Sequence, residues 1–151
     1  MNFSIQNIVA VFNRIDQRLV GFMTLYGLRL IRLSLAVIFI WFGWLKVIGR
    51  SPVAYLVENT VYWVPPKFFV PFLGVWEITI GLGLLFHFAL RLTLFLFWLQ
   101  LTGTFLVLIL RPDIAFQGGN PLFLTTEGEF VIKNLVLISA GLVIGSTVKN
   151  K

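Results

Sequence analysis

Four apolar stretches, each about as long as a membrane crossing, constrain the fold of this chain more than any other feature. An α-helix rises about 1.5 Å per residue, so roughly 20 apolar residues cross the ~30 Å of hydrocarbon in a bilayer. Hydrophobic residues make up 58% of the 151 residues and charged residues only 12%, which leaves too little polar chain to cover four such helices in water. The sequence therefore predicts an all-α fold, an integral membrane four-helix bundle in residues 28–151, with spans at about 30–48, 68–90, 92–110 and 130–148.

The segment that precedes the first span, residues 1–27, has the pattern of an amphipathic helix. Its apolar side chains recur at a spacing of three or four residues, and polar or charged side chains occupy most positions between them. This pattern is typical of a helix that lies in a membrane interface with its apolar face in the lipid. We therefore expect an N-terminal interfacial helix on the cytoplasmic surface, which serves as an anchor or a packing strut in preference to a dedicated partner site.

The basic residues predict the orientation of the spans. Four spans place both termini on one side of the membrane, and the positively charged side of a membrane protein is the cytoplasmic one. The net charge of +6 also indicates attraction to anionic lipid. No basic stripe with interleaved aromatics is present, so we expect no nucleic-acid partner. The side of the termini collects most of the basic residues and one acid: Arg14, Arg18, Arg29, Arg32, Arg91, Lys149, Lys151 and Asp16.

Polar side chains interrupt the predicted spans. At about 1.5 Å per residue, Glu77 lies ~13 Å below the outer surface and Gln100 lies slightly deeper. Lys46 and Lys133 lie nearer the outer ends of their spans. A charge at mid-bilayer costs roughly 2.5–3.5 kcal/mol on insertion scales. We therefore expect a lysine from another span to reach Glu77, within a candidate cluster of Lys46, Glu77, Gln100, Lys133 and Asn134.

Glycines lie on the same helix faces as these polar residues. Small residues let the backbones of membrane helices approach closely. Gly74 and Gly81 share a face with Glu77, for example, and Gly103 shares one with Gln100. The predicted helix-packing positions are Gly43, Gly74, Gly81, Gly103, Gly141 and Gly145.

Two interpretations of the polar cluster remain open. It is either an internal clasp that fixes the helix register, or the lining of a pocket, open to the outer leaflet, that binds a polar head group such as a quinone ring or lipid, or relays protons. No catalytic arrangement is visible. The absence of cysteine excludes thiol chemistry and iron–sulfur ligation within this chain. The single histidine, His87, excludes a self-contained histidine metal cluster, and we expect it to be an interfacial aromatic residue.

Four sequence stretches, in order and at the right spacing, resemble the DoxX-like family of small bacterial membrane proteins. They are "FIWFGWLKVIGRSP", "VPFLGVWEITIGLGLLF", "LQLTGTFLVLILRPD" and "TEGEFVIKNLVLISAGLVIG", and the resemblance runs from about residue 28 to residue 148. The residues that match the family's patterns are Phe39, Gly43 and Lys46 in the first span, Trp76, Glu77 and Gly81 in the second, and Gly128, Phe130, Lys133 and Asn134 at the fourth.

The resemblance implies a four-helix bundle in a bacterial cytoplasmic (inner) membrane. The family is named after a subunit of a thiosulfate:quinone oxidoreductase, and some members associate with partners that handle thiols or superoxide. The lack of cysteine argues against a thiol step in this chain. We expect a non-catalytic accessory or scaffold subunit that contacts lipids and other membrane subunits or further copies of itself. The alternative is the membrane subunit of a quinone-linked oxidoreductase, with Glu77 as a proton acceptor and Lys46 or Lys133 holding a quinone oxygen.

Overall fold

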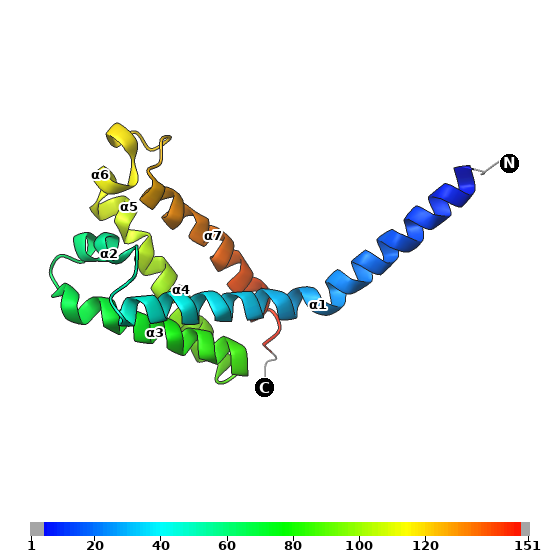
Figure 1. Cartoon of the computed structure of the whole chain (residues 1–151), viewed down its shortest axis with the longest axis horizontal. Coiled ribbons are helices and arrows are strands. Elements are labelled where there is room, and N and C mark those ends of the chain that lie inside the picture. The colour runs from blue at the N-terminus through cyan, green and yellow to red at the C-terminus, as the bar shows by residue number, and fades with distance from the viewer. Residues whose placement is uncertain (1–4, 149–151) are drawn as a thin grey trace. The chain divides into compact units, whose positions relative to one another are not determined.

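The long helix α1 (Ile5–Val47) is continuous from the predicted surface segment into the first predicted span (Figure 1). The structure, a computed structural model, describes residues 5–148 and the side chains of residues 9–148. The chain divides into two compact units, residues 1–31 and residues 32–151. The predicted boundary at residue 27 stays a prediction.

The first unit consists of the N-terminal part of α1. Its described side chains, from residue 9 onward, are exposed or half-buried within the chain, although many of them are large and apolar, such as Phe12, Leu19 and Met23. A single helix cannot bury so much apolar surface by itself, which is the property that the amphipathic pattern predicts. Its location on a membrane surface stays a prediction.

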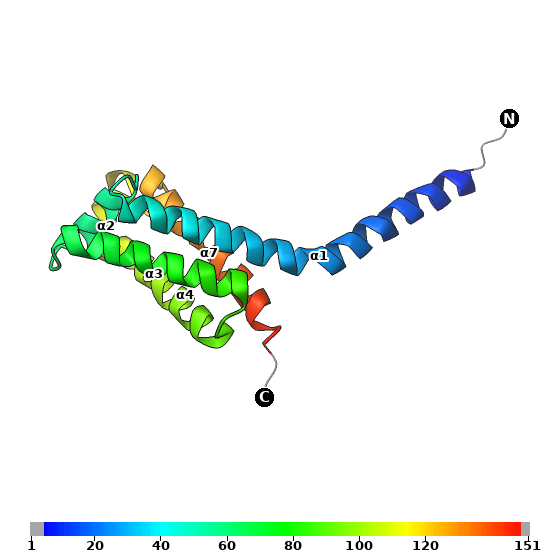
Figure 2. The ribbon, with the colours of Figure 1, turned by 60° about the horizontal axis from the view of Figure 1, so that its bottom comes forward.

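The second unit is all-α over its described residues, apart from one isolated β-bridge between Phe116 and Leu124. Figure 2 shows α3 and α4 as an antiparallel pair beside the C-terminal part of α1. Its helices after α1 are α2 (Ala54–Thr60), α3 (Pro66–Phe86), α4 (Leu90–Thr104), α5 (Leu106–Leu110), α6 (Pro112–Ala115), the short 3₁₀ helix η1 (Gln117–Gly119) and α7 (Thr126–Gly145).

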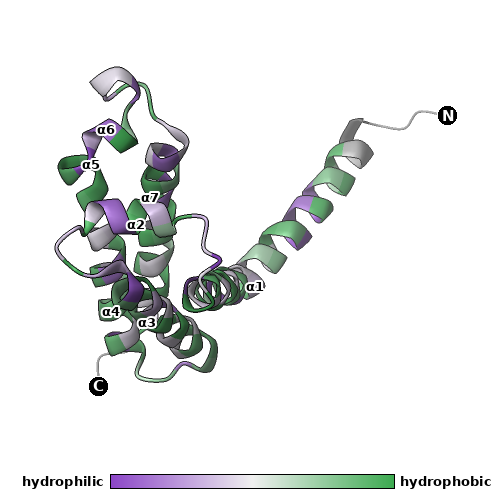
Figure 3. Cartoon of the chain, turned by 60° about the vertical axis from the view of Figure 1, so that its left-hand side comes forward, coloured by the Kyte–Doolittle hydropathy of each residue, from purple (hydrophilic) through white to green (hydrophobic). Residues whose placement is uncertain are grey.

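Four helical segments of the described chain are long and apolar enough to cross a membrane, as the sequence predicted. They are Val9–Val47, Pro66–Phe86, Leu90–Leu110 and Thr126–Gly145. In Figure 3, hydrophobic residues extend over the long helices of the second unit, and hydrophilic residues gather at α2, α6 and the start of α7. This distribution suggests a multi-pass membrane protein.

Close backbone contacts between helices depend on glycine. A Cβ added to Gly43 of α1 would lie 2.5 Å from the carbonyl oxygen of Gly74 in α3, and one added to Gly81 would lie 2.8 Å from that of Ala36. Gly141 of α7 packs against the ring of Phe97 in α4 with the same lack of space, at 2.5 Å. These four predicted glycines therefore lie where a larger side chain would push two helices apart.

The other two predicted packing glycines behave differently. A Cβ on Gly145 would make an ordinary contact at 3.6 Å, and one on Gly103 would meet nothing within 4 Å. Gly103 therefore makes no close helix contact within the described chain, and its packing role stays a prediction. Two tight positions were not predicted: Gly83, which meets the side chain of Thr93, and Gly128, which meets the carbonyl of Ala115.

The third predicted span is interrupted at Phe105, between α4 and α5. The amide of Phe105 donates to the carbonyl of Thr102 at 3.2 Å, one residue nearer than in a regular α-helix. The hydroxyl of Thr104 donates to the carbonyl of Leu101 at 2.6 Å, and Nδ2 of Asn134 in α7 donates to that hydroxyl at 2.9 Å. Side chains thus supply the hydrogen bonds that the break removes, as an irregular helix at membrane depth requires.

Candidate functional site

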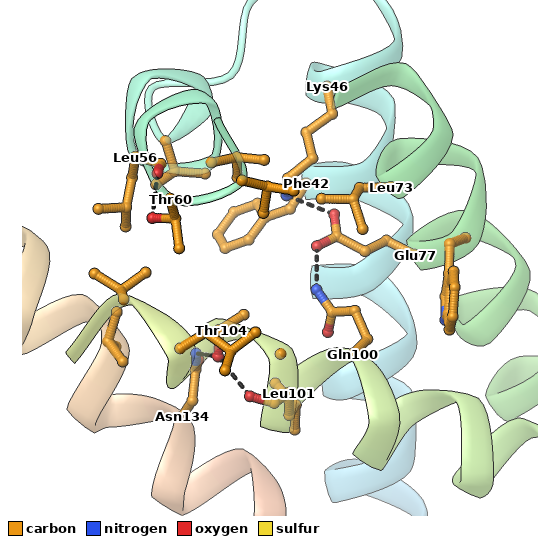
Figure 4. A pocket seen from close by; sticks show the side chains of 18 of the residues that line it. Phe42, Lys46, Leu56, Thr60, Leu73, Glu77, Gln100, Leu101, Thr104 and Asn134 are labelled. Atoms are coloured by element: carbon orange, nitrogen blue, oxygen red, sulfur yellow. Dashed lines mark hydrogen bonds and ion pairs between the residues drawn. The ribbon is translucent and has the colours of Figure 1, made fainter. Parts of the chain in front are cut away.

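The polar side chains of three helices meet inside the second unit. Nζ of Lys46 lies 2.6 Å from Oε2 of Glu77, and Nε2 of Gln100 donates to Oε1 of Glu77 at 2.7 Å (Figure 4). Lys46 and Glu77 are each only 5% exposed. The structure therefore places Glu77 between α1 and α4, with one donor on each carboxylate oxygen.

The glycine contact between α1 and α3 positions this ion pair. Lys46 follows Gly43 by three residues, and Glu77 follows Gly74 by three residues, so each charged residue lies one helical turn beyond the point of closest approach. The lysine can then extend along α3 and reach the carboxylate while its aliphatic chain stays buried. The close contact and the ion pair thus belong to one local arrangement.

The energetics of the pair depend on both partners being present. Moving a charged group out of water costs several kcal/mol, and a close partner with further hydrogen bonds offsets most of that cost. Here the two charges cancel, and the amide of Gln100 supplies the additional hydrogen bond. Loss of either charge would leave the other buried without compensation, at a cost of about 3–5 kcal/mol.

Gln100 has one polar atom left over. Its Nε2 must face Glu77, because a carboxylate oxygen requires a donor, and this fixes the orientation of the amide. Its Oε1 is buried, and no group in residues 5–148 donates a hydrogen bond to it. A buried acceptor without a donor costs about 1–3 kcal/mol.

A largely apolar cavity of about 560 Å³ adjoins this cluster. Its volume lies in the range of sites that hold drug-sized ligands. Side chains from α1, α2, α3, α4, α5 and α7 line it, and Figure 4 shows Glu77 and Gln100 on one part of the wall and Thr104 and Asn134 on another. The cluster is therefore also part of a cavity wall, which a purely internal clasp would not require.

Lys133 does not join the ion pair. Its Nζ lies 3.1 Å from Oε2 of Glu129, one turn earlier in α7, and its side chain is 73% exposed. It contributes to the cavity lining but makes no ion pair with Glu77, so of the two lysines that the sequence offered, Lys46 fills this role. Asn134, the next residue, is buried and bonds to Thr104 instead of Glu77.

The short helix α2 forms another part of the cavity wall. Arg111, which precedes α6, links α2 to α6 through a hydrogen bond and an ion pair. Leu56 and Thr60 of α2 line the cavity. The guanidinium of Arg111 donates to the backbone carbonyl of Asn59 at 3.0 Å and pairs with Asp113 at 2.8 Å. The hydrogen bond from Arg111 holds the pKa of Asp113 below its usual value. The sequence did not predict this link, because the hydrogen bond from Arg111 goes to the backbone carbonyl of Asn59, and a backbone acceptor leaves no pattern in the sequence.

His87 lies apart from the cavity, in the hairpin between α3 and α4. It is exposed, and both His87 (φ 57°) and Ala89 (φ 42°) have left-handed backbone conformations. This position is consistent with an interfacial residue and brings no ligand to the polar cluster. Within residues 5–148, no group of three His, Asp or Glu side chains could hold a metal ion.

Comparisons of the chain with protein families, with curated proteins and with solved structures found no match.

Proposed function

We propose that this chain is a small multi-pass membrane protein of the DoxX-like type and a non-catalytic subunit of a larger membrane assembly, and that its partly open cavity binds a lipid-like molecule. It lies in a bacterial cytoplasmic membrane with both termini in the cytoplasm. The single observation that supports the binding role best is the Lys46–Glu77–Gln100 cluster on the wall of a largely apolar cavity. A few polar groups that converge in an apolar pocket are typical of a small-molecule site.

The exposed surface supports the assignment as a subunit. The long helices of the second unit keep much of their apolar surface unburied within that unit. Lipid covers part of such a surface in a membrane, and neighbouring subunits or further copies of the chain can cover the rest. The cavity lining includes no arrangement of nucleophile and base, which favours binding over catalysis.

A second candidate is the membrane subunit of a quinone-linked oxidoreductase. The observation that favours it is the carboxylate of Glu77, which lines the cavity together with Trp63 and Trp76. An aromatic and apolar pocket of this size suits a quinone ring. Reduction of the ring takes up protons, and the carboxylate would relay them by accepting each proton and passing it to a quinone oxygen.

The test is to isolate the protein gently from its native membrane and to identify the small molecules and proteins that remain bound. Gly103→Phe is the informative variant, because Gly103 lines the cavity and an added side chain there meets open space. Thr102→Phe is the matched control, because Thr102 is exposed on the same helix and does not line the cavity.

We expect a lipid-like molecule to be retained by the wild type and by Thr102→Phe and to be lost from Gly103→Phe. A retained quinone that Glu77→Gln loses would favour the oxidoreductase subunit. A wild-type protein that retains no small molecule beyond bulk lipid would contradict the binding role, and Glu77→Gln protein that still assembles with its partners would then favour a scaffold alone.

A further inference from the structure

We propose that α2 is a lid that closes the cavity against water, that Arg111 is the latch that holds this lid, and that the occupant enters from the hydrocarbon of the bilayer instead. The inference rests on the proposed function, because it assumes a binding cavity inside a membrane protein. It goes further by naming the route to the site, and with it the class of ligand: a molecule that dissolves in lipid and not in water.

The cavity has an apolar rim. Residues that line the cavity and are also exposed at the surface of the second unit mark this rim, and the charged one among them, Lys133, is paired with Glu129 at 3.1 Å. Hydrocarbon can cover such a rim without loss, whereas water would meet a large apolar patch. We therefore infer that this opening faces the bilayer. The rim includes Phe42 of α1, Phe72 of α3, Leu99 of α4, Leu106 of α5 and Phe130 of α7.

The helix α2 lies between the cavity and the hydrophilic end of the second unit. Its Leu56 and Thr60 are buried and line the cavity, as Figure 4 shows, whereas Tyr55 and Glu58 on its other face are exposed. In Figure 3 the hydrophilic residues gather at α2, α6 and the start of α7. A helix with buried side chains toward the cavity and an exposed carboxylate on its outer face has the arrangement of a cover between the cavity and water.

Polar contacts attach α2 to the rest of the chain at one place. The helix has seven residues and no side-chain cap at its N-terminus, and a helix this short is not stable by itself. The side chains of Asn59 and Thr60 donate to carbonyls within the same segment. Among the described residues, Arg111 therefore supplies the hydrogen bonds that join α2 to a distant part of the chain. The other attachment is apolar, through Leu56 in a small cluster with Val107.

The guanidinium of Arg111 is held in a fixed orientation. Its Nε and Nη2 donate to the two carboxylate oxygens of Asp113 at 3.0 and 2.8 Å, which is a bidentate pair. Its Nη1 donates to the backbone carbonyl of Asn59 at 3.0 Å. That carbonyl belongs to the last turn of α2, where carbonyls have no partner within the helix. Asp113 thus orients the guanidinium, and the guanidinium fastens the C-terminal end of α2.

The test uses single cysteines, because the chain contains none. Gly103→Cys reports on the cavity, since Gly103 lines it and an added side chain there meets open space. Thr102 is exposed on the same helix and does not line the cavity, and Leu122 is 86% exposed in the loop before α7, so Thr102→Cys and Leu122→Cys are the controls. Each variant, in lipid nanodiscs that expose both membrane faces, reacts with a charged methanethiosulfonate that stays in water and with an uncharged maleimide that enters the bilayer.

We expect the charged reagent to label Leu122→Cys rapidly and the other two variants slowly. The uncharged reagent should label Gly103→Cys and Thr102→Cys alike. Adding Arg111→Gln should speed charged labelling of Gly103→Cys about tenfold, the weight of one hydrogen bond from a charged donor, and leave Thr102→Cys shielded. Lys67→Gln is the matched control, because it removes an exposed cation from the first turn of α3, and it should change neither rate.

Charged labelling of Gly103→Cys that is as fast as that of Leu122→Cys would show a cavity open to water and would overturn the lid. An unchanged rate with Arg111→Gln, or equal acceleration at Thr102→Cys, would overturn the latch. Failure of the uncharged reagent at Gly103→Cys alone would overturn entry from the bilayer. The retained molecule that tests the proposed function is a separate measurement. A shielded thiol in a protein that retains no ligand would therefore remove the binding role and leave the lid.

Discussion

Glu77→Gln is the substitution whose effect the structure predicts most sharply. It removes the negative charge and keeps the size of the side chain. The carbonyl of the introduced amide can still accept from Gln100, but the ammonium of Lys46, which is 5% exposed, loses its counter-charge. We expect the free energy of unfolding to fall by about 3–5 kcal/mol, the cost of leaving one charge of a buried pair without its partner.

The double variant Lys46→Met with Glu77→Gln tests the reason for that loss. It removes both charges and keeps the amide contact to Gln100. Because replacing a buried ion pair by neutral side chains of similar volume is often nearly neutral, we expect the double variant to recover most of the stability that Glu77→Gln loses. The exposed pair provides the matched control: Glu129→Gln removes a similar charge at a similar distance from Lys133, and we expect a loss of at most about 0.5 kcal/mol.

The assay is unfolding of the purified protein in mild detergent by titration with SDS, followed by tryptophan fluorescence. The ion-pair reasoning is refuted if Glu77→Gln costs no more than Glu129→Gln. It is also refuted if the double variant loses the sum of the losses measured for Glu77→Gln alone and for Lys46→Met alone, because the two charges would then act independently.

Three further predictions concern other contacts. Gly74→Ala should lower the free energy of unfolding by about 1–3 kcal/mol, because its Cβ would lie 2.6 Å from a backbone oxygen of α1. Gly103→Ala, whose Cβ meets open space, should not destabilise the protein, and SDS titration of both variants tests this. Thr104→Val should lower stability by about 0.5–1.5 kcal/mol in the same titration, because it removes the hydrogen bond that compensates for the helix break, and an unchanged midpoint would contradict this role. Arg111→Gln should speed hydrogen exchange of the α2 amides and raise the pKa of Asp113, measured by NMR titration. Because the folded-state pKa of that carboxyl lies below its unfolded value, its contribution to stability is present at neutral pH, is lost as the pH falls through the folded-state pKa, and should be smaller in the variant.

The long helices could be predicted because membrane crossing imposes a simple condition of length and apolarity. Their ends could not. The second span was predicted to reach residue 90, but α3 ends at Phe86, because His87 and Ala89 adopt left-handed conformations. Neither residue is a glycine, so the sequence carries no ordinary signal for this turn.

The break at Phe105 was not predictable for a related reason. Gly103 and Thr104 are compatible with a helix, and the hydrogen bonds that make the break tolerable come partly from Asn134, which lies 30 residues further along the chain. Local sequence patterns contain no information about such a partner. The predicted shared face of Gln100 and Gly103 lines the cavity, and Gly103 makes no close contact with another helix there.

The polar cluster was predicted in part. Depth along the helix placed Glu77 and Gln100 at similar levels, and the structure brings them together with Lys46. Depth alone could not choose between Lys46 and Lys133, because the choice depends on how each helix is rotated about its axis. Glu129, four residues before Lys133 in the same helix, was the signal that could have identified a local partner for that lysine.

The most direct test of the account is a solid-state NMR measurement of the ion pair in lipid bilayers. Within residues 5–148, protein labelled with ¹⁵N at lysine Nζ and ¹³C at the glutamate carboxyl should show strong dipolar coupling from two pairs, Lys46–Glu77 and Lys133–Glu129. In the Glu129→Gln variant the buried pair remains among the described residues, and we predict that its coupling persists and disappears when Lys46→Met is added. If no coupling survives in Glu129→Gln, Glu77 does not meet Lys46 in the membrane, and the cluster on which the proposed site depends does not exist.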